Sequence, residues 1–383
     1  MKLESASSIL LLAAVIIAML AANSPLAGLY NELLDTTVAV QVGALSINKP
    51  LLLWVNDGLM AIFFFLIGLE VKREVMEGGL SSFSQIVLPG VGALGGMVIP
   101  AAIYAWMNWS DPTALDGWAI PVATDIAFAL ALLSVFGSRV PTALKFFLLT
   151  LAISDDLAAI FIIAIHYSWD LSLSALFIGA IALAVAITMN RTGVTRTSSY
   201  ILLGVVLWIA VLKSGVHGTL AGVLIAFCIP MQDEHGNSPL RELEHDLHGP
   251  VAFVILPIFA FANAGLSLAG MSIEGLTHPV TLGIISGLLV GKPLGILVFT
   301  GFAVGLGFAQ LPKNVNWTQL LGVAFACGIG FTMSLFIAGL AFEHGSGDYF
   351  SGDRLGILVG SILSALVAFA LLHFSLPKSA RSD

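Results

Sequence analysis

Charged residues are scarce in this sequence of 383 residues. Asp, Glu, Lys and Arg make up only 10% of it, hydrophobic residues make up 58%, and the mean hydropathy is +1.00. This composition excludes a soluble globular protein and indicates a chain that crosses a membrane several times. Basic patches are also missing, which argues against a nucleic-acid partner. The partner that the composition predicts is the lipid bilayer.

Cysteine is nearly absent as well. Cys228 and Cys327 are the two cysteines, and both lie within apolar runs. So few thiols, so far apart in the chain, indicate neither a disulfide framework nor a metal cluster. We therefore expect no cofactor.

Long apolar runs are abundant, and short polar links or links with Gly or Pro separate them. Runs of this length can cross the roughly 30 Å hydrocarbon core of a bilayer as helices. Twelve can be read, near residues 9–28, 51–69, 86–107, 118–136, 142–167, 172–189, 199–212, 214–230, 248–266, 280–308, 317–342 and 354–376. The sequence thus predicts an all-α polytopic membrane protein with twelve spans. We expect a single membrane domain over 1–383, with core helices near 86–167 and 280–376.

Lys and Arg are unevenly distributed between the two sides that twelve spans define. Eleven lie on the side of the two termini and three, Lys49, Lys213 and Arg354, lie on the other side. Because basic residues are enriched in cytoplasmic loops, both termini are expected to be cytoplasmic.

The longest segment on the outer side runs from residue 29 to 50. Within it, residues 38–48 (VAVQVGALSIN) alternate apolar with small or polar residues around Gly43. This pattern is typical of a β-hairpin, which we place at about 38–49 on the periplasmic side. An exposed hairpin can pair edge to edge with a second copy, so the hairpin either mediates a homodimer or is only an ordered loop.

Two adjacent acids interrupt the run 142–167 near its middle. Asp155 and Asp156 stand where a single Asp costs about 2.5 to 3.5 kcal/mol on insertion scales. Two ionised neighbours also repel each other, so the pair indicates a functional site. The alternative is that one of them is a structural hydrogen-bonding group packed against a neighbouring helix.

Two other apolar runs contain residues that break helices. In the fourth, Pro121 precedes Thr124 and Asp125, and proline disfavours helix just upstream of it. In the eleventh, Gly328 and Gly330 lie at the middle, next to Thr332. Paired interruptions in the two halves of a polytopic protein are typical of a transport site built from broken helices. The alternative for each break is a simple kink.

The tenth run combines a glycine stripe with a basic residue. Its glycines recur every four residues, at 283, 287, 291 and 295, which favours close helix packing. Lys292 lies beside the stripe with about a dozen mostly apolar residues on each side. It either extends to an interface or, as we expect, is the buried partner of a carboxylate.

The residue types fit the binding of an alkali cation, which prefers oxygen ligands. Neighbouring residues on a helix point about 100 degrees apart, so Asp155 and Asp156 are expected to divide the roles of ion binding and interaction with another span. Because burial disfavours the charged form of any ionisable group, protons and Na+ can compete for these carboxylates. Competition at one alternately exposed site is sufficient for antiport.

Three other classes of function can be weighed against antiport. An intramembrane aspartyl protease needs aspartates on separate spans and a Gly-x-Gly-Asp signature, which precedes neither Asp125 nor Asp155. A passive cation channel is usually built from repeated subunits, whereas this site has single-copy charges with an opposing Lys, and a dependence of flux on a proton gradient would separate the two. A purely structural subunit would need neither the acid pair nor the buried Lys. The protein is therefore not expected to be an enzyme.

Six motifs together resemble one family. They are ATDIAFAL at 123–130, AISDDL at 152–157, KSGVHGTLAG at 213–222, LPIFAFANAG at 256–265, GKPLG at 291–295 and CGIGFTMS at 327–334. They are similar to those of the NhaA-type Na+/H+ antiporters of bacterial inner membranes, over nearly the whole chain. The resemblance implies twelve helices in inverted-topology repeats, with discontinuous fourth and eleventh helices that cross near the midplane. It also implies a secondary transporter for sodium export and pH homeostasis, which is electrogenic and also accepts Li+.

The resemblance assigns roles at the site. Asp156 would be the principal ion-binding carboxylate, and Asp155 would pair with Lys292 in the ion-free state. Asp125 would offset the helix-end dipoles at the crossing and Thr124 would contribute a ligand. The chain departs from the family pattern at Ser154, where an aliphatic residue is expected, which adds a hydroxyl near the site.

The resemblance further implies inactivation at acidic pH through residues at the cytoplasmic funnel. The candidates are Glu70, Lys72, Arg73, Glu74 and Glu77 at the end of the second run, Glu244, His245 and His248 before the ninth, and His217 in the eighth. Histidine titrates in the required range. The alternative is that these are solvated helix ends, with His217 a packed, hydrogen-bonded histidine.

The hairpin hypothesis predicts that deletion of residues 40–48 abolishes a homodimer, because the strand edges that pair the two copies are lost. Crosslinking in membranes measures this. An unchanged crosslinked dimer in the deletion variant would exclude the hairpin as the dimer contact.

Overall fold

The structure is a computed structural model that describes residues 2–43, 45–78, 83–168, 171–268, 273–312, 315–342 and 350–377. Within these ranges the chain is mostly helical and has one two-stranded sheet. Contacts divide it into two compact units. The first unit comprises Met1–Ile9, Ser82–Ala159 and Leu266–Asp383, and the second comprises Leu10–Ser81 and Ile160–Gly265. Each unit is described by itself, and α1 (Lys2–Ala22) and α8 (Thr142–His166) have residues in both.

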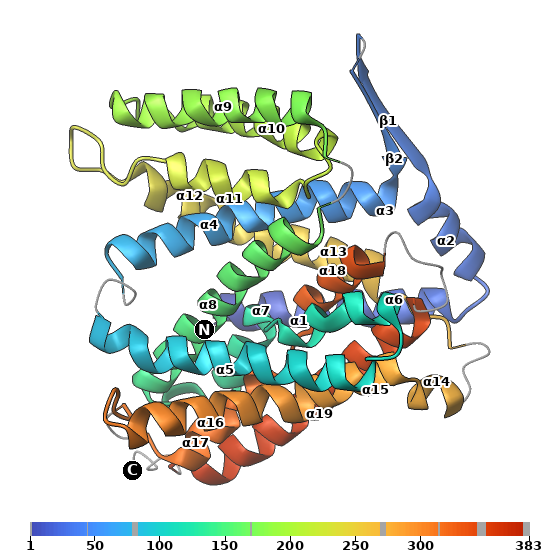
Figure 1. Ribbon diagram of the computed structural model, residues 1–383, viewed down its shortest axis with the longest axis vertical. Helices are drawn as coiled ribbons and strands as arrows, with labels where there is room; N and C mark the ends of the chain where they lie inside the picture. Colours follow the sequence, from blue (N-terminus) through green and yellow to red (C-terminus); the bar gives the residue numbers. More distant parts are fainter. Residues whose placement is uncertain are drawn as a thin grey trace. The chain divides into compact units, whose positions relative to one another are not determined.

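The second unit is built from helices that lie along one another. Its elements are α2 (Ala27–Asp35), α3 (Leu51–Trp54), α4 (Met60–Met76), α9 (Leu173–Arg191), α10 (Thr197–Lys213), α11 (Thr219–Cys228), α12 (Pro239–Pro250) and α13 (Leu256–Ala264), with π-helical segments at Val55–Leu59 and Val251–Ile255. In Figure 1, α9, α10, α11 and α4 follow one another as neighbours, and consecutive pairs of them are in contact.

The sheet of the second unit is the hairpin expected from the sequence. Strands β1 (Thr37–Val42) and β2 (Leu45–Pro50) are antiparallel, and Val38 pairs with Lys49 while Gln41 pairs with Ser46. Gly43 adopts φ +61° in the turn, a conformation that glycine adopts at no steric cost. The hairpin is thus confirmed. It lies close to the predicted bounds because the turn residue and the alternation are both local signals.

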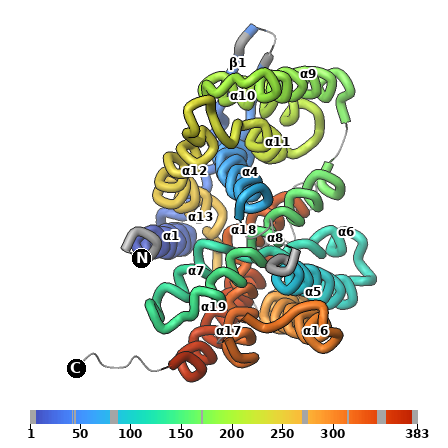
Figure 2. The backbone as a smooth tube through the Cα atoms, turned by 90° about the vertical axis from the view of Figure 1, so that its left-hand side faces the viewer, coloured from blue at the N-terminus to red at the C-terminus, as the bar shows by residue number. Residues whose placement is uncertain are grey.

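The first unit contains the remaining elements. They are α5 (Phe83–Met107), α6 (Pro112–Leu115), α7 (Ile126–Val135), α14 (Ile273–Thr277), α15 (Pro279–Ser286), α16 (Lys292–Gly305), α17 (Trp317–Cys327), α18 (Phe331–Phe342) and α19 (Phe350–Ser375), with 3-10 helices at Asp116–Val122 and Gly137–Arg139 and a π-helical segment at Gly287–Gly291. Helix α5 contacts α16, and α17 contacts α19, as Figure 2 shows.

Eight helical segments in the described residues are long and apolar enough to cross a membrane, or ten if each of two bent pairs is one span. Two shorter apolar helices, α10 and α11, lie where the seventh and eighth spans are expected. The structure thus supports a mostly helical protein with several spans. The count of twelve stays a prediction.

Helix α9 illustrates why the chain needs a bilayer. Its buried positions are Ala175, Gly179, Ala182 and Ala186, all small, so that α10 can approach closely. Its large apolar side chains are exposed instead, with Leu173 at 81% and Phe177 at 67%. Such a surface is unfavourable in water and compatible with lipid.

Two segments of the first unit are interrupted near the residues that predict a break. After the 3-10 helix Asp116–Val122, residues 123–125 are non-helical, and α7 begins at Ile126. Helices α17 and α18 are separated by a short break and bent by 43°. Pro121 lies just before the first of these places and Gly328 and Gly330 lie at the second, and both residue types weaken the continuous helical hydrogen-bond ladder.

The glycine stripe of the tenth run contacts α5 and the 3-10 helix. A Cβ on Gly291 would lie 2.7 Å from Pro100 Cα, and one on Gly287 would lie 2.6 Å from Pro121 Cβ. A Cβ on Gly95 or on Gly295 would overlap the backbone carbonyl of the other. These close approaches seat α16, and with it Lys292 at its first position, against α5.

The substitution Gly295→Val should destabilise the protein because its side chain would force α16 away from the α5 backbone. Overpacking of this kind costs about 1–3 kcal/mol or more. Gly305→Val on the same helix is the matched control, since nothing lies within 4 Å of a Cβ there. The measurement is the apparent melting temperature in detergent, and equal values for the two variants would contradict the packing argument.

Candidate ion-binding site

The adjacent acids of α8 are both buried inside the first unit. Asp155 and Asp156 are each 1% exposed. Asp155 Oδ2 accepts hydrogen bonds from Lys292 Nζ at 2.6 Å and from Thr124 Oγ1 at 2.7 Å. Asp155 Oδ1 is buried and accepts no hydrogen bond from the described residues. A buried carboxylate oxygen of this kind could serve as a ligand for a cation.

Lys292 is the cation of a fully buried ion pair. Its side chain is 0% exposed, so it does not extend to an interface as the alternative reading required. Its ammonium donates to Asp155 and also to the backbone carbonyl of Val122, at the end of the 3-10 helix. Removal of one partner from such a pair leaves an uncompensated charge and typically costs about 3–5 kcal/mol.

Asp125 caps two helices at once. Its Oδ1 accepts from Phe128 N at 3.1 Å at the start of α7, and its Oδ2 accepts from Thr332 N at 2.9 Å at the start of α18. The Thr332 hydroxyl donates to the same oxygen at 2.5 Å. A carboxylate is favourable at helix N-termini because the unpaired N–H groups there carry partial positive charge. One acid thus stabilises the restart of both interrupted segments.

The two interruptions also bind each other through their carbonyls. Thr124 Oγ1 lies 2.9 Å from Cys327 O, and Asp125 N donates to Ile329 O at 2.6 Å. In the other direction, the Ser334 hydroxyl donates to Ile120 O at 2.7 Å. Polar backbone groups freed by a break must find partners in a membrane interior, and here each segment supplies partners to the other.

Sequence reasoning did not find some of these contacts. Ser334 and the Val122 carbonyl were not candidates, and Thr332 was only part of a break. A usable signal existed, since hydroxyl residues one or two turns from a glycine break can cap freed backbone groups. The extra hydroxyl of Ser154 donates to Thr150 O at 2.7 Å on its own helix, so it is engaged away from the carboxylates.

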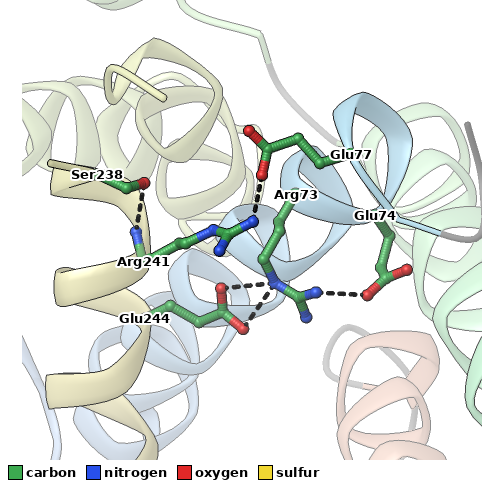
Figure 3. A network of polar contacts seen from close by, with 6 residues as sticks. All are labelled: Arg73, Glu74, Glu77, Ser238, Arg241 and Glu244. Atoms are coloured by element: carbon green, nitrogen blue, oxygen red, sulfur yellow. Dashed lines mark hydrogen bonds and ion pairs between the residues drawn. The ribbon is translucent and has the colours of Figure 1, made fainter. Parts of the chain in front are cut away.

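The candidates for pH response lie in the second unit. Arg73 donates to Glu244 at 2.9 Å and to Glu74 at 2.7 Å, and Arg241 pairs with Glu77 at 2.5 Å. Figure 3 shows that these contacts join the end of α4 to α12. Glu70 is half-buried on α4, one turn before Glu74. Lys72, also on α4, donates to the carbonyls of Phe227 and Ile229 at the end of α11.

The three histidine candidates lie outside the ion pairs of Arg73 and Arg241. His245 and His248 are exposed on α12. His217 lies just before α11, where its Nε2 is 3.2 Å from Asp57 Oδ1, and Asp57 Oδ2 accepts from Lys49 at 2.7 Å. Sequence reasoning missed Asp57, although an acid inside the second apolar run is a signal of the same kind as Asp155.

Comparison with known proteins covers nearly the whole chain. The family model described as Na+/H+ antiporter 1 matches residues 1–372. The Na(+)/H(+) antiporter NhaA of Pseudomonas fluorescens strain Pf0-1 is 59% identical over 371 residues, which are 97% of this chain and 94% of the relative. That of Aeromonas hydrophila is 58% identical over 377 residues, or 98% and 95%. That of Shewanella sp. strain ANA-3 is 58% identical over 375 residues, or 98% and 96%.

Proposed function

We propose, since this chain belongs to the Na+/H+ antiporter 1 family, that it exports Na+ in exchange for protons as a multi-pass protein of the bacterial inner membrane. The family consists of transporters and not of enzymes. The observation that carries the proposal is the buried ion pair of Asp155 and Lys292 between two interrupted segments, with Asp156 next along the helix. Charges this costly to bury are typical of ion pathways.

The mechanism follows from competition for the two carboxylates. In the ion-free state Lys292 neutralises Asp155. Na+ then binds with Asp156 as the principal ligand and with oxygens of Asp155 and Thr124 as further ligands, and Lys292 is released from its partner. Protons displace Na+ from the same groups. Whichever side of the membrane the site opens to, it therefore carries either Na+ or protons. Li+, also a hard cation, fits the same oxygen ligands.

The charge inventory supports electrogenic exchange. Two protonatable carboxylates, Asp155 and Asp156, serve one monovalent cation. If both are protonated on the return step, more protons enter than Na+ ions leave. Net positive charge then moves inward in each cycle, and the membrane potential drives sodium export.

The proposed architecture is a single transporter domain over 1–383 with twelve spans in inverted repeats. Its fourth and eleventh spans are the interrupted segments at 112–135 and 317–342. Alternating access by inverted repeats around a fixed site suits this arrangement. Both termini are cytoplasmic in this proposal, because of the excess of Lys and Arg on their side.

The proposal includes a homodimer through the periplasmic hairpin. Support comes from the two-stranded sheet, in which no third strand of the described residues pairs with β1 or β2. Val40 on β1 is also 48% exposed. Such an edge can pair with a second copy.

The rival readings find less support. An aspartyl protease needs two aspartates that share one substrate, but both carboxylate oxygens of Asp125 accept hydrogen bonds from Phe128 and Thr332. A passive channel would not require the fully buried ion pair of Lys292 and Asp155.

Asp156→Asn should abolish exchange because an amide cannot alternate between a proton and Na+. The measurement is dequenching of a pH-sensitive dye in everted vesicles of an antiporter-deficient strain, with Na+, Li+ or K+ between about pH 6 and pH 9, a range that brackets the titration of shifted carboxylates. We expect a signal with Na+ and Li+ in the wild type and none in the variant. Asp35→Asn, at an exposed acid of α2, is the control and should retain the signal.

A wild type that gives no signal at any pH would sink the proposed exchange. Full activity of Asp156→Asn would leave the exchange standing and show that the site is assigned wrongly.

The proposed pH regulation uses the network between α4 and α12, with Glu70, Arg73, Glu74, Glu244, His245, His248 and His217 as its candidates. Glu244→Gln removes one of the two carboxylates that hold Arg73, so the pH of half-maximal activity should shift by about half a unit, as expected for a partly exposed pair worth about 0.7 kcal/mol. Arg241→Gln is the matched control, since that side chain is 60% exposed in its pair with Glu77. Equal pH profiles for wild type and Glu244→Gln would contradict the proposal.

A further inference from the structure

The Thr124 hydroxyl lies between two acceptors and can donate to only one of them. Its oxygen is 2.7 Å from Asp155 Oδ2 and 2.9 Å from the backbone carbonyl of Cys327. A hydroxyl has one hydrogen and two lone pairs, so one of the two contacts lacks a donor at any moment. The side chain is 0% exposed, so solvent does not reach it from outside. The position of one hydrogen therefore distinguishes two states of the site.

The ion-paired site favours one position. Asp155 pairs with Lys292 and is ionised in that state, and a carboxylate is a stronger acceptor than a peptide carbonyl. The hydroxyl accordingly donates to Asp155. Cys327 is the last residue of α17, where carbonyls lack partners within the helix. In the ion-free site the α17 end thus has no hydrogen from Thr124.

We propose that Na+ on the carboxylates reverses the hydrogen bond of Thr124. This inference rests on the proposed function. A cation beside Asp155 attracts the hydroxyl oxygen and repels its hydrogen, so the hydroxyl rotates about the Cβ–Oγ1 bond and donates to Cys327 O. No covalent bond breaks, and only the direction of donation changes. Thr124 is thus both a ligand of Na+ and the residue that links ion binding at Asp155 to the end of α17.

This switch connects ion binding to the second interruption. In the empty site the contact between Thr124 and Cys327 is without a hydrogen, and in the loaded site it becomes a full hydrogen bond. The neighbouring links, Asp125 N to Ile329 O and Ser334 to Ile120 O, involve neither carboxylate of α8 and stay unchanged. With Na+ bound, the two interrupted segments therefore share one more hydrogen bond than they do in the empty site.

The scarcity of cysteine allows a direct test. Cysteine labelled with ¹³C at its carbonyl enters only positions 228 and 327, and Cys228→Ala leaves Cys327 as the one labelled carbonyl. Cys228 is buried and belongs to the second unit, whereas Thr124, Asp155 and Cys327 belong to the first. Infrared difference spectra of the full-length protein at one alkaline pH, with Na+ or choline, then report hydrogen bonding at this carbonyl.

We expect Na+ to shift the labelled carbonyl band of the Cys228→Ala protein to lower frequency, because a new hydrogen bond weakens the C=O bond. Adding Thr124→Val, which lacks the hydroxyl at similar volume, should leave the Na+-free band where it was and remove the Na+-induced shift. Thr124→Ser should restore that shift. The Na+-free comparison does not require that the valine variant binds Na+.

Three results would overturn the proposal. They are a band that Na+ leaves unchanged or moves to higher frequency, a Na+-free band that is already displaced in Thr124→Val, and a Na+-induced shift that survives in Thr124→Val. Tracer ²²Na+ binding and the dye assay on the same Cys228→Ala protein distinguish a failure of the hydrogen-bond switch from a failure of the proposed exchange. If it binds and exchanges Na+ but the band fails to respond, the hydrogen-bond switch is wrong and the exchange stands. If it neither binds nor exchanges Na+, the proposed function itself is wrong.

Discussion

A charge buried in a membrane protein must be paired, and the ion pair of Asp155 and Lys292 is where this constraint is greatest. Both side chains are 0% exposed, and the ammonium also holds the Val122 carbonyl. Loss of either partner would leave an uncompensated charge in a medium of low dielectric constant. Pairing therefore determines where α8 and α16 lie relative to the first interruption. The close approach of Gly295 to Gly95 places α16 so that Lys292 can reach Asp155.

The interrupted segments satisfy the same constraint for the backbone. Each break frees N–H and C=O groups that have no water to bond with. Asp125 supplies the acceptor for the starts of α7 and α18, Ser334 donates its hydroxyl to the Ile120 carbonyl, and Asp125 N donates to the Ile329 carbonyl. Mutual capping explains how two breaks can coexist in one unit. It also keeps the site rich in oxygen atoms, which is what a small hard cation requires.

Ion binding and its proposed regulation use different kinds of electrostatics. The site residues of the first unit are fully buried, so each charge there is costly to leave without its partners. The network of Arg73, Glu74 and Glu244 in the second unit is partly exposed, and such pairs are individually weak and sensitive to pH and salt. Strong pairing suits a site that must hold Na+ or protons before it changes the side of the membrane to which it opens. Weak pairing suits a response that is graded with pH.

Features that arise from local chemistry can be predicted from the sequence alone. The apolar length of α8, the turn at Gly43, the breaks near Pro121 and Gly328, and the stripe that ends at Gly295 all follow from residue type and spacing. Tertiary structure decided which partner each polar group takes. Residue spacing could not tell whether Asp155 or Asp156 faces Lys292, since neighbours differ by about 100 degrees and the rotation of α8 is set by packing. The partners of Asp57 and Ser334 could not be predicted either, because His217 and Ile120 lie more than 150 residues away from them in the chain and meet them only when the helices pack.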